Sequence, residues 1–123
     1  MQKMTKGQLE SKISEAMIKF EKEFMGRGPM ETNTFLIKDA VLVRLKGVLT
    51  PAEEQLAKSS EGALLIKKTR VQLLEGAKYL LRNIIMDITA CNISSLHSDI
   101  STKTGERIIV FILDQNLESR FND

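Results

Sequence analysis

The stretch that decides the fold is residues 92–114, which read NISSLHSDISTKTGERIIVFILD. β-Branched and other apolar residues recur in both of its halves, as is typical of strands. Between the halves lies Lys103-Thr104-Gly105, where the glycine can take the left-handed backbone conformation that is common in three-residue hairpin loops. We therefore predict an antiparallel hairpin with strands over 92–102 and 106–114.

A three-residue loop fixes which side chains face each other across this hairpin. It sets His97 opposite Phe111 and Asp99 opposite Ile109, on one face of the sheet. The last strand then carries apolar side chains on both faces, which is typical of a strand in the centre of a sheet. A slip of one residue in this register would exchange the two faces.

The chain before this hairpin contains another helix and another hairpin. Apolar residues recur every three or four positions over 5–25, with Thr5 as the expected N-cap. Strands are predicted over 34–38 and 41–48, because both segments are rich in β-branched or aromatic residues. They lie on either side of a tight turn at Asp39-Ala40, so a second antiparallel hairpin is expected here.

Two further helices connect the hairpins. In Thr50-Pro51-Ala52-Glu53, threonine can cap a helix, proline suits its first position, and glutamate can reach back to the cap amide. A short helix should therefore run to residue 58. A long helix follows over 61–88, in which Gly62 and Gly76 each cost about 1 kcal/mol relative to alanine.

The apolar residues of this long helix cover a wider arc than one sheet would bury. A second contact surface is therefore expected, and a homodimer would supply one. The residues that widen the arc are Leu64, Leu65, Val71 and Leu74.

Taken together, the elements predict one α+β domain over residues 1–123. Two units, each a helix with a hairpin, would form a mainly antiparallel four-stranded sheet packed with helices. The composition, with 42% apolar and 28% charged residues, is ordinary for a folded globular protein.

Charge and cysteine content narrow the range of functions. The 18 basic and 16 acidic residues are interspersed and leave a formal charge of +2, so electrostatics gives little reason to expect nucleic acid or anionic lipid as a partner. Cys91 is the only cysteine, which excludes an internal disulfide. Residues 1–8 lack the apolar segment of a secretory signal, and no run of about 20 apolar residues occurs in the sequence. We therefore expect a cytoplasmic protein that reaches a membrane only through a partner protein.

His97 and Asp99 are the most plausible residues for acid-base chemistry. Two positions apart on a strand, they should share one face at about 7 Å. Metal binding usually needs three or four protein ligands, and the chain has one histidine, so no metal site or cofactor is expected. Cys91 would lie about 20 Å away at the other end of the strand, so no catalytic residue is predicted. A surface or interface contact is the favoured interpretation of this pair.

Five other residues are candidates for contacts with a ligand or an interface. Arg27, between two glycines after the first helix, lacks an evident structural role. The remaining four lie near the hairpin tips, where they could form a small basic patch for an acidic partner or RNA, although a solvated tip is commoner. These four are Arg44, Lys103, Glu106 and Arg107.

Three ordered stretches read IKFEKEFMGRGP (18–29), VRLKGVLTPAE (43–53) and SLHSDISTKTGER (95–107). With these stretches the chain resembles the MpsC-like family of small bacterial proteins. The resemblance implies a non-catalytic accessory or regulatory subunit of a Na⁺-translocating, membrane-potential-generating system of the cation or bicarbonate transport type. Such a system would also have a multi-spanning, proton-channel-like protein and a large soluble partner. The family brings no established catalytic residues.

Two alternatives remain open from the residues themselves. The basic residues at the hairpin tips are compatible with a nucleic-acid-binding module, which steeply salt-dependent binding would reveal. The pair His97 and Asp99 is compatible with a small enzyme, in which replacement of His97 would abolish activity without unfolding the protein.

Overall fold

Helices and strands follow one another in the predicted order of helix, hairpin, short helix, long helix and hairpin. The computed structural model describes residues 4–121, and the ends of the predicted domain at 1–3 and 122–123 lie outside this range. The elements are α1 (Lys6–Met25), β1 (Glu31–Ile37), β2 (Ala40–Lys46), α2 (Pro51–Leu56), α3 (Ser60–Thr89), β3 (Ile93–Ser101), β4 (Glu106–Leu113) and the 3-10 helix η1 (Leu117–Phe121).

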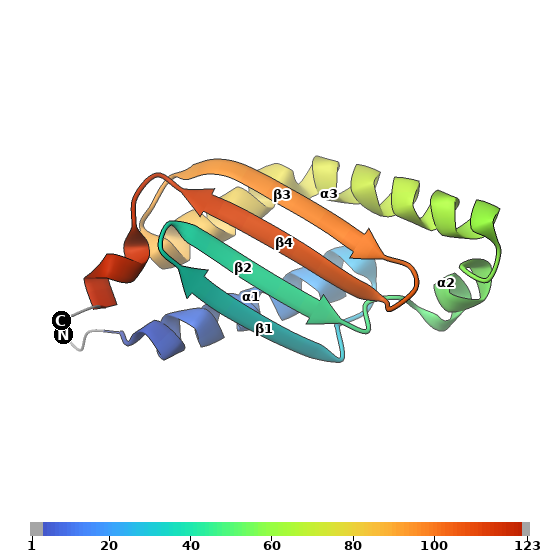
Figure 1. Cartoon of the computed structure of the whole chain (residues 1–123), viewed down its shortest axis with the longest axis horizontal. Helices are drawn as coiled ribbons and strands as arrows, with labels where there is room; N and C mark the ends of the chain where they lie inside the picture. Colours follow the sequence, from blue (N-terminus) through green and yellow to red (C-terminus); the bar gives the residue numbers. More distant parts are fainter. Residues whose placement is uncertain (1–3, 122–123) are drawn as a thin grey trace.

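The strands form one four-stranded sheet in the order β1-β2-β4-β3 (Figure 1). Each neighbouring pair is antiparallel. The predicted α+β class with an antiparallel four-stranded sheet is therefore confirmed. β4 lies inside the sheet, as expected for a strand with apolar side chains on both faces.

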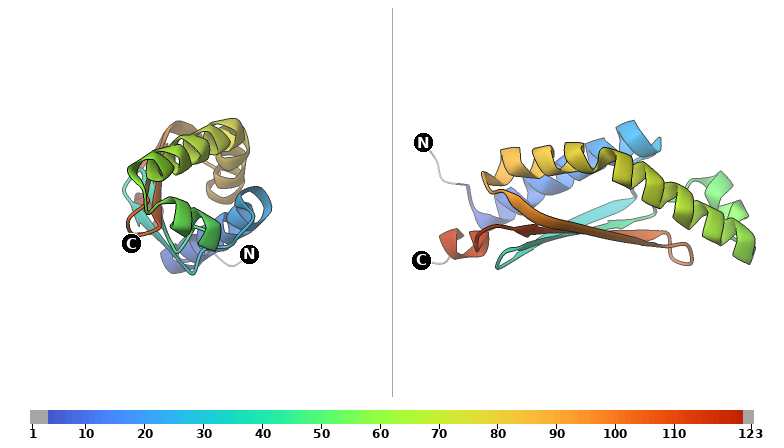
Figure 2. Two further views of the ribbon diagram at one scale, coloured as in Figure 1. Left: turned by 90° about the vertical axis from the view of Figure 1, so that its right-hand side faces the viewer. Right: turned by 90° about the horizontal axis from the view of Figure 1, so that it is seen from above.

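The long helices α1 and α3 both pack on the same face of the sheet. α1 contacts β1 and α3 contacts β3, and the view from above in Figure 2 shows both helices on one side of the strands. No helix covers the opposite face within the part of the chain that the structure describes. The fold is thus a two-layer arrangement with one open sheet face.

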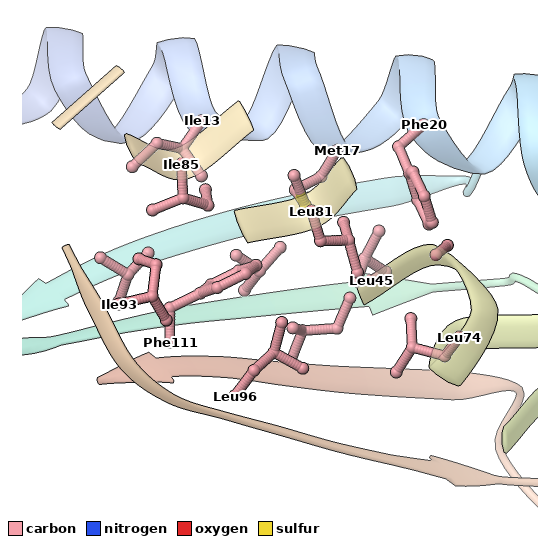
Figure 3. Close-up of a cluster of buried hydrophobic side chains, with 14 of the residues drawn as sticks. Ile13, Met17, Phe20, Leu45, Leu74, Leu81, Ile85, Ile93, Leu96 and Phe111 are labelled. Atoms are coloured by element: carbon pink, nitrogen blue, oxygen red, sulfur yellow. The ribbon is translucent and has the colours of Figure 1, made fainter. Parts of the chain in front are cut away.

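The core lies between this helix layer and the sheet. Alternate residues of each strand point toward the helices, because successive side chains of a strand point to opposite faces. Figure 3 shows how the two layers meet. The residues labelled there are Ile13, Met17, Phe20, Leu45, Leu74, Leu81, Ile85, Ile93, Leu96 and Phe111, and all are buried.

The predicted helix starts are confirmed by their hydrogen bonds. Thr5 and Gln8 form a capping box at α1, with each backbone amide donating to the other side chain. Thr50 and Glu53 do the same at α2, at distances of 3.1 and 2.9 Å. These bonds satisfy backbone amides that have no partner within the helix.

The turn of the first hairpin lies one residue earlier than predicted. Ile37 pairs with Ala40, which leaves Lys38 and Asp39 as a two-residue turn. Lys38 adopts a left-handed conformation with φ of 56°, as two-residue hairpin turns require. Lysine carries no sequence signal for this conformation, so the prediction at Asp39-Ala40 was wrong.

The loop of the second hairpin is also longer than predicted. Ser101 pairs with Glu106, so the loop has four residues, Thr102 to Gly105, in place of three. Gly105 takes the expected left-handed conformation, with φ of 72°, and its amide donates to the Ser101 carbonyl at 2.9 Å. The position of the glycine was therefore correct, whereas the loop length was not.

This extra loop residue shifts the predicted register by one. His97 lies opposite Val110 and Asp99 lies opposite Ile108, rather than opposite Phe111 and Ile109. As a result, His97 and Asp99 share a sheet face with Ile108 and Val110 instead of Ile109 and Phe111. His97 and Asp99 belong to the open face, away from the core.

Gly62 has a structural role beyond its low helix propensity. A Cβ atom at this position would lie 1.9 Å from the carbonyl oxygen of Leu56, where the end of α2 meets the start of α3. At Gly76, in the middle of α3, no atom lies within 4 Å of the same position. Gly62 is therefore needed for packing, whereas Gly76 only lowers the helix propensity of α3.

We expect Gly62→Ala to lower the free energy of unfolding by about 1–3 kcal/mol or more through overpacking. The matched control Gly76→Ala should raise it by about 0.5–1 kcal/mol, because alanine loses less backbone entropy in a helix. Urea unfolding of both variants measures these changes. Equal effects of the two substitutions would show that the α2–α3 contact is not tight.

Candidate functional site

The open face of the sheet carries an apolar surface. Ile108 alternates along β4 with the buried Ile109, so its side chain points away from the helices. Phe35 and Ile37 of the edge strand β1 are 45% and 53% exposed. We call this surface the open-face patch, and it consists of Phe35, Ile37, Leu42, Ile108, Val110 and Ile112.

Charged residues at the end of this patch are paired with one another. Arg44 Nε lies 2.6 Å from Glu106 Oε2, across the β2–β4 pair. Lys46 Nζ lies 3.6 Å from Glu31 Oε2 on the neighbouring strand. Of the predicted basic patch near the hairpin tips, Arg44 therefore has an acidic partner, which lowers the attraction of the patch for a polyanion.

His97 and Asp99 lie on the edge strand β3, each with its own partner. His97 Nε2 is 3.1 Å from Ser95 Oγ. Asp99 accepts a hydrogen bond of 2.8 Å from the Ile100 amide and lies 3.5 Å from Lys67 Nζ of α3. Both residues are exposed, so the structure places the pair on the surface of the sheet edge rather than in an enclosed site.

Arg27 has a structural contact that was not expected. Its Nη1 donates to the carbonyl of Leu49 at 3.1 Å, and Arg70 Nη2 donates to the adjacent carbonyl of Val48 at 2.9 Å. Arg27, from the loop after α1, and Arg70, from α3, thus hold the segment between β2 and α2. Lys103 is exposed at the tip of the second hairpin.

Arg107 is not at a solvated tip, because it is 1% exposed. It points from β4 into the space beneath the helices, between Leu45 and Ile100 of the neighbouring strands. There it joins three other charged residues, and we call this group the interior charge cluster. Its members are Glu21 of α1, Glu53 of α2, Arg70 of α3 and Arg107 of β4.

Within the cluster, Arg70 and Glu53 form a bidentate ion pair. Arg70 Nε lies 2.9 Å from Glu53 Oε2, and Arg70 Nη2 lies 2.6 Å from Oε1. Burial acts to raise the pKa of Glu53, but hydrogen bonds from Arg70 and the Thr50 backbone outweigh it and lower the pKa below its ordinary value. This pair joins α2 to α3, and its Glu53 carboxylate is charged at neutral pH.

Glu21 and Arg107 lack such partners. Both carboxylate oxygens of Glu21 are buried without a hydrogen bond, as are Nε and Nη1 of Arg107. Burial raises the pKa of Glu21, although the charge of Arg107 opposes this shift. Burial likewise lowers the pKa of Arg107, and the charge of Glu21 opposes it. The charge of each group therefore affects the pKa of the other, although no hydrogen bond joins these atoms.

The sequence contained a signal for both buried charges. Glu21 follows Met17 by four residues and so falls on the apolar stripe of α1. Arg107 precedes Ile109 and Phe111 by two and four residues, in phase with the buried side of β4. The place of Arg107 beside the turn favoured a solvated position, so the prediction missed its burial.

A cavity of about 60 Å³ lies beside Arg70 and Arg107, between α3 and the β3–β4 pair. Its other lining residues are Val71, Leu74, Glu75, Lys78, Leu96, Ser98, Asp99 and Ile100. Residues 4–121 contain no group of three or more His, Cys, Asp or Glu side chains placed to hold a metal ion. Across the same range, no helix has the length and apolar character needed to cross a bilayer.

These features define a small α+β domain with an uncovered apolar sheet face and charges buried beneath its helices. The model of one protein family, described as "Na+-translocating membrane potential-generating system (MpsC)", matches residues 5–115. The chain therefore belongs to the MpsC family.

Two relatives from Bacillus subtilis (strain 168) are similar to this chain. The uncharacterized protein YbcI is 44% identical over 116 residues, which cover 94% of each chain. The uncharacterized protein YrhF is 23% identical over 104 residues, which cover 83% of this chain and 84% of YrhF. No solved structure matches the chain significantly.

The raised pKa of Glu21 predicts a pH-dependent stability. The folded state binds the Glu21 proton more tightly than the unfolded chain does, so this residue's contribution falls as pH rises above its ordinary pKa of 4.5 toward the folded value. Glutamine cannot ionise, so the Glu21→Gln variant does not lose stability in this way as the pH rises. The free energy of unfolding of Glu21→Gln, relative to the wild type, should therefore increase between about pH 4.5 and pH 7.5.

Urea unfolding of both proteins at several pH values measures this difference. A difference that falls with rising pH would mean that Glu21 is stabilised as a carboxylate, against the effect of its burial.

Proposed function

We propose that this protein is a non-catalytic accessory or regulatory subunit of a Na⁺-translocating, membrane-potential-generating system. The observation that carries the proposal is the family match over residues 5–115, whose description names that system. The protein would act in the cytoplasm and reach the membrane by binding another component of the system.

The open-face patch supports a role in protein binding. Its apolar residues lie on three adjacent strands, and Phe35 and Ile37 remain about half exposed. Contiguous apolar surface on a folded protein favours association with a partner. The paired charges Arg44 and Glu106 border the patch and would form the polar rim of such an interface. We assign this face to the component of the membrane system.

The outer surface of α3 supports a second contact. Leu64, Leu65, Val71 and Leu73 are between 48% and 55% exposed, although they lie on the helix that covers the core. Of the residues predicted to widen the apolar arc, Leu74 is buried, whereas the other three are exposed. We assign this surface to a second copy of the chain, so that the working form is a homodimer.

If the open-face patch binds the partner, a substitution in this patch should lower the amount of partner that is recovered. Affinity purification of the tagged protein from gently solubilised membranes of its native host should recover a transporter-type protein. Phe35→Ser should reduce this recovery about tenfold or more, since one aromatic anchor at an interface contributes roughly 2 kcal/mol.

The matched control is Phe24→Ser, which replaces a phenylalanine on the helix α1 that is 50% exposed, close to the 45% of Phe35. This variant should recover the partner as the wild type does. Recovery of no transporter-type protein in several mild detergents would count against the proposed function, and equal loss in both variants would count against the open-face patch.

The dimer assignment predicts a concentration-dependent mass in sedimentation equilibrium. The wild type should approach twice the chain mass of 13.9 kDa as its concentration rises. Leu73→Glu places a charge on the outer surface of α3 and should shift the equilibrium toward the monomer by about tenfold or more. A wild type that stays monomeric at all concentrations would exclude the homodimer.

A further inference from the structure

The two edges of the sheet differ in how their backbone groups are covered. β1 forms one edge, and α1 and η1 lie against it. The amide of Leu36 in β1 donates to Glu10 Oε2 of α1 at 2.8 Å. Just beyond β1, the amide of Lys38 donates to Glu118 Oε1 of η1, also at 2.8 Å. β3 forms the other edge, so the cover of its backbone groups has to be established separately.

The direction of the backbone groups in β3 follows from the turn of the first hairpin. Ile37 and Ala40 close a two-residue turn, so the groups of Ala40 bond to β1. Along an antiparallel strand, the side to which the N–H and C=O groups point alternates from one residue to the next. Followed through the pairs of β2 with β4 and of β4 with β3, this alternation points His97 and Asp99 toward β4. The residues whose groups point away from the sheet are Leu96, Ser98 and Ile100.

A hydrogen bond within β3 supports this direction. The Ile100 amide donates to Oδ1 of Asp99 at 2.8 Å, an acceptor on its own strand rather than on β4. Across residues 4–121, the outward groups of Leu96 and Ser98 receive no such hydrogen bond from a neighbouring element. β3 is therefore an open edge, in contrast to β1.

An extended protein segment is the ligand that matches this row of groups. Alternate residues of a strand lie about 7 Å apart, so the outward N–H and C=O groups recur at that spacing. A strand laid alongside presents its acceptors and donors at the same spacing. Such an added strand gains its affinity from main-chain hydrogen bonds and its specificity from contacts of alternate side chains.

The position of α3 excludes a second copy of this sheet as the added strand. α3 runs along β3 (Figure 1), with Lys67 Nζ 3.5 Å from Asp99 Oδ1 and Arg82 Nη1 3.4 Å from the Ile93 carbonyl oxygen. Because each α3 lies over its own β3, pairing of two β3 strands would bring the two helices to about 5 Å, one strand spacing. Packed helices need about 8–10 Å between their axes. The occupant is therefore a segment that carries no helix over its own strand.

We propose that the β3 edge binds an extended segment of a component of the membrane system, which pairs with Leu96, Ser98 and Ile100 as a fifth strand. This site rests on the proposed function, which supplies the protein partner. It lies at the opposite edge of the sheet from Phe35 of the open-face patch, so the partner has two separate contacts with the domain.

The cavity of about 60 Å³ between α3 and the β3–β4 pair determines which side chain the segment carries at its centre. Ser98 pairs with the buried Ile109, so a residue that pairs with Ser98 on the other side also faces the helix layer. There it meets the cavity, whose wall includes the apolar side chains of Val71, Leu74 and Leu96. A small apolar residue is therefore expected at the centre of the segment.

Substitution of Ser98 tests the site in the full chain. Ser98→Pro removes an outward N–H and no hydrogen bond to β4, so the protein should fold. Affinity purification from gently solubilised membranes of the native host should recover the transporter-type protein about tenfold or more weakly with this variant. The interface loses a backbone hydrogen bond, and the proline ring obstructs the added strand. The matched control Ser98→Ala keeps the N–H and should recover the partner as the wild type does.

Amide hydrogen exchange tests the site without a substitution. In the free protein the amides of Leu96 and Ser98 should exchange faster than those of His97 and Asp99, which bond to β4. Solubilised membranes of the native host should slow the exchange of Leu96 and Ser98. The amide of Lys103, at an exposed position of the hairpin loop, should be unchanged.

The outcomes separate this site from the proposed function. Equal recovery of the partner by the wild type and by Ser98→Pro would overturn the site and leave the proposed function standing. Recovery of no transporter-type protein by the wild type would overturn both. If Ser98→Pro unfolds, unchanged exchange of Leu96 and Ser98 in the presence of the membranes overturns the site. Slower exchange of these amides at high concentration of the protein alone would identify a second copy as the occupant and would overturn it likewise.

Discussion

The alternation of side chains along β4 is the constraint on which the rest of the structure depends. β4 lies inside the sheet, so its residues must face either the helices or the open face. Ile109, Phe111 and Leu113 fill the core, and the same phase carries Arg107 into the interior. The opposite phase places Ile108, Val110 and Ile112 on the open face. The register of β4 therefore determines both the apolar surface on the open face and the burial of Arg107.

The burial of Arg107 explains why charged residues of several helices meet at one end of the sheet. A guanidinium removed from water needs acceptors and an opposite charge. Glu21 supplies a nearby charge without a hydrogen bond, and the pair of Arg70 and Glu53 satisfies itself. The incomplete pairing around Arg107 leaves its Nε and Nη1 buried without an acceptor.

Local signals in the sequence were enough to predict the order of the helices and strands from α1 to β4, although β1 begins at Glu31 rather than at residue 34 and the 3-10 helix η1 was not predicted. The caps at Thr5 and Thr50 were predictable because a side chain bonds to a backbone amide three residues away, which no distant contact can change. The register of the second hairpin was not predictable from local signals, because one extra loop residue shifts every pair of residues across the two strands. Gly62 depends on a contact with the carbonyl of Leu56, so its necessity appears only when α2 and α3 are packed together. The pairing of Arg44 with Glu106 likewise joins residues far apart in the chain.

Thiol labelling at two adjacent positions of β4 tests the central claim most directly. The native Cys91 is 2% exposed and is replaced by serine to give a cysteine-free background. In this background Ile108→Cys should react readily with a thiol reagent, whereas Ile109→Cys should be protected in the folded protein. Addition of solubilised membranes from the native host should then slow the labelling of Ile108→Cys, because the partner covers the open face. Faster labelling at position 109 than at 108 would contradict the register, and with it the account of both the surface and the buried charge.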